Sequence, residues 1–221
     1  MDQVCNMTDE TFDREFWERR WAQALREHPD EVAIRPPNAH LVAEIGDVAP
    51  GLSLDAGCGH GAEAIWLAAS GWRVTAVDFS VTALEHARAM AQAVGGDVAE
   101  RIAWIAGDLG SWEPPPRHFD LVSCSYVNIR GSVREMVARL ATGVAPGGTL
   151  FLVGHLPVDP ATGEPTPAAG QVQVTVEEAV GALDSREWNV VLAEERTRAV
   201  GTGVDAVVRA VYRPSRCGRR G

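Results

Sequence analysis

The chain has 221 residues, of which 46% are hydrophobic and 23% charged, as is typical of one globular domain with a full core. Its formal net charge of −10 at pH 7 argues against a nucleic-acid partner, because nucleic-acid binding normally requires a basic face. All 20 Lys+Arg residues are arginines, which excludes chemistry that needs a lysine, such as a Schiff base or a P-loop.

Nothing in the sequence predicts a membrane protein or a secreted one. No apolar run reaches the length of a membrane span, and the start, Met1 to Val4, has neither a basic leader nor an apolar segment. The four cysteines are scattered, without the spacing of a metal site. We therefore expect a cytoplasmic protein with reduced cysteines, no metal and no membrane partner, existing as a monomer or homodimer.

Two helices are predicted before the first strand. Residues 11–27 place aromatic side chains, including Trp17 and Trp21, at helical spacing, which indicates an amphipathic helix. A second helix is predicted to begin at Pro36-Pro37. The two tryptophans either pack in the core or belong to a lid over a site.

From residue 49 onward, short apolar runs alternate with helical patterns. Strands are predicted at 52–56, 72–77, 102–106, 119–123 and 149–153, and helices at 60–69, 81–94 and 133–140. This alternation is typical of a parallel sheet with crossover helices. We therefore predict an α/β fold, a doubly wound Rossmann-like sheet with helices on both faces.

The last part of the chain departs from this pattern. Residues 155–170 form a long loop rich in Pro and Gly, which in a compact domain is typical of a functional lid or a disordered segment. A short helix is predicted at 176–183. The runs 188–195 and 204–212 then indicate an antiparallel C-terminal hairpin that completes a mostly parallel, seven-stranded sheet.

The most informative stretch is the glycine-rich turn after the first strand. Residues 52–61 read Leu-Ser-Leu-Asp-Ala-Gly-Cys-Gly-His-Gly and lead directly into a helical pattern. Glycine has no Cβ and tolerates positive φ, so Gly57 and Gly59 allow a ligand to lie against bare backbone. Alone the turn is a weak signal, because Gly57, Gly59 and Ala62 also satisfy the dinucleotide-binding pattern G-x-G-x-x-A.

Three carboxylates follow the first three predicted strands. Asp55 ends the first strand, Asp78 ends the second, and Asp108 follows the third. Ligands of open α/β sheets bind beyond the carboxyl ends of the strands, so we expect these acids around one crevice. An acid at the tip of the second strand of a βαβ unit is placed to hydrogen-bond a ribose diol.

These motifs, together with residues 119–122 and Pro146-Gly147-Gly148, resemble those of class I S-adenosylmethionine-dependent methyltransferases over residues 41–212. Finer similarity, carried by the aromatic segment 16–21, points to small-molecule enzymes of the thiopurine and tellurite-resistance type. The resemblance implies S-adenosyl-L-methionine as cofactor and a small-molecule methyl acceptor. It also implies a single methyltransferase domain over 1–213, with N-terminal lid helices at 1–48, a cofactor-binding core at 49–155, a substrate loop and hairpin at 156–213, and a disordered tail at 214–221.

The resemblance further implies a role for each motif. The loop of Asp55, Gly57 and Gly59 would carry the methionine part of the cofactor. Asp78 would bind the ribose hydroxyls, and Asp108 the adenine amino group. Further cofactor contacts are expected from Phe79, Leu109, Ser125 and Trp21.

Methyl transfer is an in-line displacement at carbon, for which the protein mainly has to align the acceptor and exclude water. A base is needed only if the acceptor must lose a proton. The catalytic candidates lie at the ends of strands four and five, namely Tyr126, Asn128 and His155. His155 is alternatively a histidine hydrogen-bonded within the lid, and Tyr126 and Asn128 alternatively fill the corner between strand and helix.

Other functions remain open from the sequence. An NAD(P)-dependent oxidoreductase would fit the glycine turn, although the chain has no Tyr-x-x-x-Lys pair and its sheet is predicted to end antiparallel. A catalytically silent S-adenosylmethionine-binding protein would share the same motifs. So would a related enzyme that uses the sulfonium for other chemistry.

Overall fold

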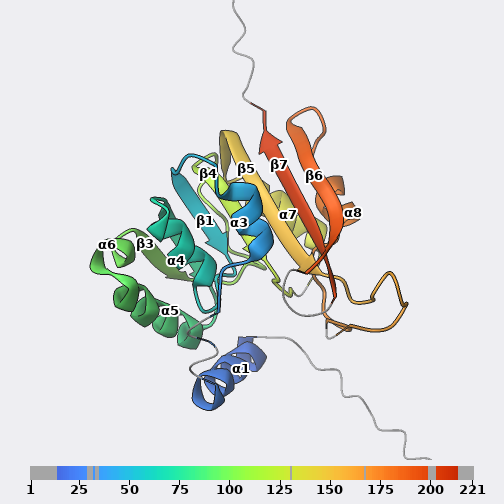
Figure 1. Cartoon of the computed structure of the whole chain (residues 1–221). Coiled ribbons are helices and arrows are strands. Elements are labelled where there is room, and N and C mark those ends of the chain that lie inside the picture. The colour runs from blue at the N-terminus through green and yellow to red at the C-terminus, as the bar shows by residue number, and fades with distance from the viewer. Residues whose placement is uncertain are drawn as a thin grey trace, which may run out of the picture.

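The computed structural model describes residues 14–28, 32, 35–129, 131–166, 168–198 and 203–213. Predictions made for residues 1–13 and for the tail at 214–221 lie outside these ranges. Figure 1 shows the elements, which in chain order are α1 (Arg14–Glu27), α3 (Ala39–Ile45), β1 (Leu52–Ala56), α4 (Ala62–Ala69), β2 (Arg73–Asp78), α5 (Val81–Val94), α6 (Gly96–Ala99), β3 (Ile102–Ala106), β4 (Phe119–Ser125), α7 (Val133–Ala141), β5 (Val144–His155), α8 (Val176–Gly181), β6 (Trp188–Thr197) and β7 (Val204–Tyr212).

The seven strands form one sheet in the order β3-β2-β1-β4-β5-β7-β6. β1 pairs in parallel with β2 and β4, and the parallel pairs β2/β3 and β4/β5 extend the sheet on either side. β7 is antiparallel to both β5 and β6. The predicted Rossmann-like fold with an antiparallel C-terminal hairpin is therefore confirmed.

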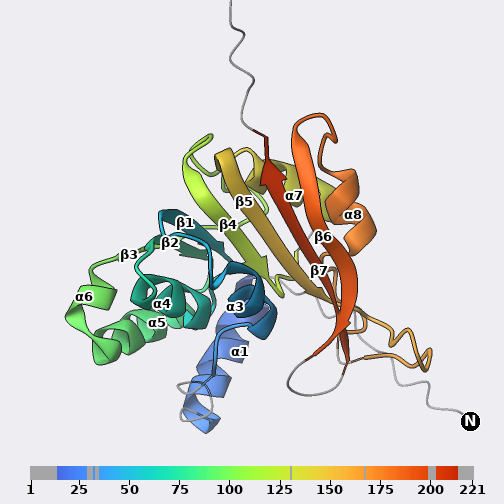
Figure 2. The ribbon, with the colours of Figure 1, turned by 45° about the horizontal axis from the view of Figure 1, so that its top comes forward.

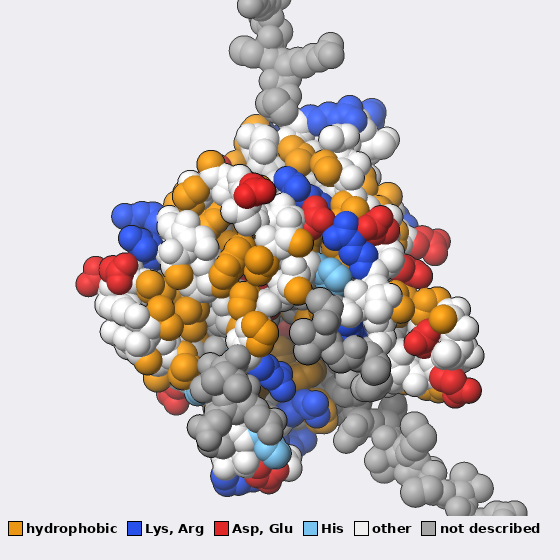
Figure 3. Space-filling view, in the orientation of Figure 1, with side chains coloured by type: hydrophobic (Ala, Val, Ile, Leu, Met, Phe, Trp, Pro, Cys, Tyr) orange, Lys and Arg blue, Asp and Glu red, His pale blue; other side chains and the backbone are white. Residues whose placement is uncertain are grey.

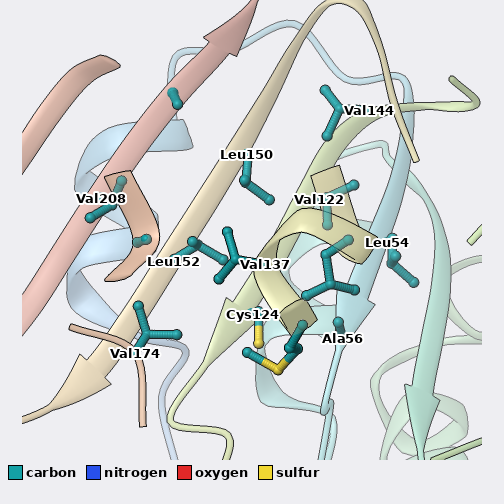
Figure 4. Packing of buried hydrophobic residues seen from close by; sticks show 14 of the residues in the cluster. Leu54, Ala56, Val122, Cys124, Val137, Val144, Leu150, Leu152, Val174 and Val208 are labelled. Atoms are coloured by element: carbon teal, nitrogen blue, oxygen red, sulfur yellow. The ribbon is translucent and has the colours of Figure 1, made fainter. Parts of the chain in front are cut away.

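Helices cover both faces of the sheet, as predicted. Side chains of α3, α4 and α5 pack in one buried cluster that includes Phe151 of β5. Side chains of α7 and α8 pack in a second cluster with Leu54 and Leu150 on the other face. Figure 4 shows Val137 of α7 among the strand residues of this second cluster. Because alternate side chains of a strand point to opposite faces, the central strands are buried on both sides.

Capping side chains set where several helices begin. The side chain of Asn38 accepts hydrogen bonds from two backbone N–H groups of α3, so this helix begins at Ala39 rather than at the prolines. Ser80 caps α5, its Oγ accepting from the N–H of Ala83 at 3.1 Å. None of the described helices is long and apolar enough to span a bilayer.

Two local predictions need correction. β5 is longer than the predicted strand at 149–153, because it begins at Val144 and incorporates a bulge. Phe119 pairs with Val144 but Leu121 pairs with Thr149, so the Pro-Gly-Gly segment lies inside the strand as extra residues. The short helix α6 was not predicted, because its two-glycine start resembles a turn.

α1 stands apart from the other helices. None of its residues is buried, and Figures 1 and 2 show it beyond the carboxyl ends of the parallel strands. Trp17 and Trp21 therefore do not pack in the core, which was one of the two alternatives. Both side chains line a cavity between α1 and the sheet.

Candidate active site

A cavity of about 890 Å³ lies at the carboxyl ends of the parallel strands. Its wall is formed by the glycine turn after β1, the ends of β2, β4 and β5, the turn after β3, and one face of α1. The cavity coincides with the point where the strand order reverses between β1 and β4, which is where open α/β sheets bind ligands. Its volume falls in the upper part of the range of about 300–1,000 Å³ found for ligand sites.

The glycine turn contributes bare backbone to this wall. Gly57 and Gly59 both line the cavity, with φ of 78° and 49°. The Gly57 N–H donates to the carbonyl of Val77 at 2.8 Å, which ties the turn to the end of β2. A Cβ on Gly59 would lie 2.9 Å from the indole of Trp21, and one on Gly57 would collide with Val127. Glycine is therefore required both for conformation and for space.

Asp78 lies at the end of β2 and is bonded to the glycine turn. Its Oδ2 accepts from the N–H of Gly59 at 2.9 Å, and its Oδ1 accepts from the N–H of Ser80 at 2.8 Å. Burial raises the pKa of Asp78 despite these two hydrogen bonds. Because each oxygen accepts one of these two bonds, each retains a lone pair. The side chain also lines the cavity, where a ligand could use these lone pairs.

Asp108, Leu109 and Phe79 form the adjoining part of the wall. Asp108 is exposed, and its Oδ1 accepts from the N–H of Gly110 at 2.8 Å. Leu109 is buried and Phe79 is half-buried, so both offer apolar surface. The structure thus brings these three residues, Asp78 and the glycine turn around one cavity, as the sequence predicted.

Asp55 lies deeper than Asp78 and Asp108. It is 2% exposed and is not among the residues that line the cavity. The hydroxyl of Ser123 donates to its Oδ1 at 3.3 Å, whereas its Oδ2 has no partner in the described part of the chain. Burial, reinforced by the charges of Glu63 and Asp78, raises the pKa of Asp55 well above its usual range.

Glu63 is a cavity carboxylate that sequence reasoning missed. It lies in the first turn of α4 and lines the cavity. Its Oε1 accepts from the N–H of Asn38 at 3.0 Å, and burial raises its pKa. Acids are common in the first turn of any helix because they complement the macrodipole, so its position gave no specific signal.

Glu18 attaches α1 to the start of α5. Its carboxylate accepts hydrogen bonds from the N–H of Val81 at 2.7 Å, the hydroxyl of Ser80 at 3.1 Å and the N–H of Thr82 at 3.4 Å. Partial burial opposes ionisation, but these hydrogen bonds prevail and lower the pKa of Glu18. A charged contact with the N-terminus of another helix is therefore one attachment of α1.

Trp21 is the second attachment of α1. Its ring lies over Gly59 and packs beside His60, with 5.6 Å between the ring centroids. Burial lowers the pKa of His60 to about 4, with Arg35 as a further cause, so this imidazole is neutral at pH 7. Trp21 thus covers the glycine turn, in the position that a lid residue requires.

A buried carboxylate on β7, Asp205, organises the other end of the cavity. It pairs with His155 across the β5/β7 ladder, and its Oδ1 lies 2.8 Å from His155 Nδ1. The Tyr126 hydroxyl donates to its Oδ2 at 2.8 Å, and Arg198 Nε donates to its Oδ1 at 2.8 Å. Burial opposes ionisation of Asp205, but these donors prevail and lower its pKa.

The rings of Tyr126 and His155 stack with 3.7 Å between their centroids, and both line the cavity. Burial and the charge of Asp205 raise the pKa of Tyr126, whose hydroxyl is already bonded to that carboxylate. The Tyr126 hydroxyl therefore stays protonated and donates to Asp205. Nδ1 of His155 lies within hydrogen-bonding reach of both Asp205 and an N–H of Arg198, and it can bond only one of them at a time. In the tautomer that donates from Nδ1 to Asp205, Nε2 is the ring nitrogen with a free lone pair for a substrate.

Two polar atoms at the end of β4 have no partner in the described chain. They are the hydroxyl of Ser125 and the Nδ2 of Asn128, both buried atoms of cavity-lining residues. The other side of the Asn128 amide is bonded, since Oδ1 accepts from the N–H of Val172 at 2.7 Å. Buried donors without partners are rare in native proteins, so both atoms indicate a place for a ligand.

The predicted lid segment contributes little of its own length to the cavity. Of residues 155–170 the structure places His155 and Ala168 in the wall, and Gln171 and Gln173 follow directly. The side chain of Gln173 accepts from the backbone N–H of His155 at 2.8 Å, which joins this segment to the end of β5.

Sequence reasoning also missed Asp205 and Arg198. Asp205 interrupts an apolar run, which predicted only a strand at the sheet edge. Its role depends on lying opposite His155, and strand register is set by long-range packing that one sequence does not reveal. Within the described ranges, no group of three His, Cys, Asp or Glu side chains is placed to hold a metal ion.

Fold and cavity together define a class of protein. A seven-stranded sheet of this order, with β7 antiparallel between β5 and β6 and a cavity at the strand ends, is a Rossmann-like methyltransferase fold. Residues 54–148 match the family model described as a methyltransferase domain. The matched segment is less than half of the chain, and the fold and this segment resemble those of class I S-adenosylmethionine-dependent methyltransferases. The oxidoreductase alternative receives no support.

Three similar proteins are named as methyltransferases. The chain is 29% identical over 117 residues to the ribosomal RNA small subunit methyltransferase C of Alcanivorax borkumensis, covering 48% of this chain and 33% of the relative, so it spans about a third of that protein's length. The N-methyltransferase NodS of Bradyrhizobium japonicum, solved with S-adenosyl-L-homocysteine, has a TM-score of 0.65 at 18% identity, over 90% of this chain and 99% of that one. A methyltransferase of Mesorhizobium loti has a TM-score of 0.62 at 20% identity, over 78% and 95%. At these identities the solved structures show the shared fold.

Proposed function

We propose that the protein transfers the methyl group of S-adenosyl-L-methionine to a small molecule held between α1 and the ends of β4 and β5. The observation that carries this proposal is that the two sides of the cavity wall differ in chemistry. Carboxylates and bare backbone lie on the side of β1 to β3, and a histidine oriented by a buried acid lies on the side of β5. The finer likeness to thiopurine and tellurite-resistance enzymes rests on the aromatic helix alone and remains an expectation.

The cofactor side of the wall suits the groups of S-adenosyl-L-methionine. Asp78 would hydrogen-bond the ribose hydroxyls, a charge-assisted contact. Asp108 would accept from the adenine amino group, with Leu109 and Phe79 against the ring. Glu63 would face the positively charged amino group, and the closely approached backbone of the glycine turn explains why no Cβ fits there.

When bound, the cofactor supplies an electrophilic methyl group on a sulfonium. The side chains at the end of β4 lie closest to where that group must be presented, because they follow the switch point of the sheet. We assign the unpartnered Ser125 hydroxyl to the cofactor and the unpartnered Asn128 amide to the acceptor. Trp21 would exclude water from this region by covering the glycine turn.

His155 is the proposed general base. Its Nδ1 faces Asp205, so Nε2 would accept the proton that leaves an N–H or O–H acceptor as the bond to the methyl carbon forms. Asp205 and Tyr126 are positioning residues, since one fixes the imidazole tautomer and the other stacks on its ring. An acceptor that has no proton to lose would not need this base.

A small acceptor is favoured over RNA by the charge and the shape of the site. The chain carries a net charge of −10, and α1 stands over the cavity, where a large substrate would have to enter. RNA recognition normally relies on a basic surface that tracks the backbone. The name of the rRNA methyltransferase relative makes RNA the competing acceptor class.

The proposal is tested by incubating the protein with methyl-labelled S-adenosyl-L-methionine and a cell extract, followed by ultrafiltration and nuclease digestion. Label is expected in the small-molecule filtrate before any nuclease is added. Label retained with RNA or protein would contradict a small acceptor. Cofactor binding without labelled product in any fraction would instead support the silent-binder alternative.

A further inference from the structure

The face of α1 that looks into the cavity carries two arginines that form no ion pair with any residue the structure describes. Arg14, Trp17, Trp21 and Ala24 recur at helical spacing and all line the cavity, with Arg20 beside them. Trp17, Trp21 and Ala24 are half-buried, whereas Arg14 and Arg20 are exposed. In Figure 3 arginine side chains gather between α1 and the body of the protein, around a recess.

The other two arginines of α1 behave differently. Arg19 forms an ion pair with Glu15, and Arg26 forms one with Glu27. Neither of these arginines lines the cavity. Within the described ranges Arg14 and Arg20 have no ion pair, and the contact found for Arg20 is with the ring of Trp17, 5.8 Å from the centroid. One helix therefore separates paired arginines facing away from the cavity from unpaired arginines facing it.

The cofactor does not account for these charges. S-adenosyl-L-methionine carries a single carboxylate, and the cavity is also lined by Arg35, whose charge acts on His60 of the glycine turn. Arg198 is already bonded to Asp205. Arg14 and Arg20 thus remain as surplus positive charge in a chain whose net charge is −10.

We infer that the methyl acceptor is an anionic molecule with a flat apolar part, whose carboxylate or phosphate is held by Arg14 and Arg20 while Trp17 contacts the apolar part. This inference rests on the proposed function and names the substrate class of the same site. Guanidinium groups bind both anions through paired N–H donors. An indole with a guanidinium above it offers a platform for a planar group.

Equilibrium binding of simple probes tests the inference without needing turnover. Phenyl phosphate and benzoate are titrated into the full chain, with benzamide as the neutral match, both with and without saturating S-adenosyl-L-homocysteine. Binding is read from tryptophan fluorescence and calorimetry. We expect at least one anion to bind more tightly than benzamide, and the stronger of the two identifies phosphate or carboxylate as the preferred group.

The double variant R14Q/R20Q should lower the affinity of the protein for that anion by about tenfold or more, the loss expected for charge-assisted contacts. R19Q/R26Q changes the net charge equally on the same helix and should leave anion binding unchanged. Equal binding of benzamide and the anions, or equal weakening by both double variants, would overturn the inference. Competition between the anions and S-adenosyl-L-homocysteine would also overturn the inference, because it would mean that the arginines bind the cofactor. Failure of S-adenosyl-L-homocysteine to bind the wild-type protein would refute the proposed function itself.

Discussion

Removing the Glu18 carboxylate should release α1 from the cavity without unfolding the domain. In Glu18→Ala the start of α5 loses three hydrogen bonds and a negative charge at its N-terminus. Loss of a capping side chain costs roughly 0.5–2 kcal/mol, and the charge near the helix dipole adds roughly 0.3–1 kcal/mol. The two ranges sum to about 0.8–3 kcal/mol, which corresponds to a roughly 4- to 150-fold larger population of undocked α1.

Because no residue of α1 is buried, this cost should appear as local opening rather than as loss of the core. Hydrogen exchange of the α1 amides should accelerate by the same factor, while the Tm of the domain changes little. Cofactor affinity should fall, since Trp21 leaves the glycine turn. Glu15→Ala is the matched control, because Glu15 lies on the same helix in an exposed ion pair at 3.7 Å, which contributes little.

The pH dependence gives an independent check. The pKa of Glu18 is lowered in the folded protein, so its contribution is present above the pKa of the unfolded chain, about 4.3, and is lost as the pH falls through the folded value. Wild-type α1 should therefore exchange as fast as the variant only at acidic pH. Equal exchange rates in Glu18→Ala and Glu15→Ala at pH 7 would refute the assigned attachment.

Three further outcomes follow from the site. Asp55→Asn should leave the Tm at pH 8 unchanged or higher, with the difference shrinking toward acidic pH, because the raised pKa makes the ionised form unfavourable in the fold; a large loss of stability at pH 8 would show that its charge is needed. His155→Gln should lower kcat by about 10²- to 10⁴-fold with unchanged affinity for S-adenosyl-L-homocysteine, and an unchanged kcat in a labelled-transfer assay would remove His155 as base. The thiol of Cys124, whose pKa burial raises to about 12, should resist alkylation at pH 8 in the native protein and react on unfolding, as mass spectrometry can show.

The sheet and the cofactor side of the cavity were predictable because they depend on local patterns. The runs ending at Asp78 and before Asp108 have strand-like composition, and parallel strands place their carboxyl ends at one edge whatever the details of packing. The glycine turn has its own signature, since only glycine tolerates both the positive φ and the close neighbours found at Gly57 and Gly59. These features needed no knowledge of long-range contacts.

The acceptor side could not be predicted in the same way. Asp205 acquires its partners through the register of β7 against β5, and Glu18 acquires its partners through the docking of α1 on a helix more than sixty residues away. Asp55 looked equivalent to Asp78, but a strand end can turn its side chain into the core or into the crevice. Only packing decides between these orientations, and packing is a property of the whole fold.

Calorimetric titration of S-adenosyl-L-homocysteine into the wild-type protein and into Asp78→Asn tests the central claim most directly. Asp97→Asn, in an exposed ion pair with Arg101 at 3.7 Å, serves as the control. We predict saturable binding by the wild type and the control, and an affinity at least about tenfold lower for Asp78→Asn, because two charge-assisted contacts are weakened. Absence of binding by the folded wild-type protein, or equal affinity in all three, would contradict a nucleoside site at the end of β2.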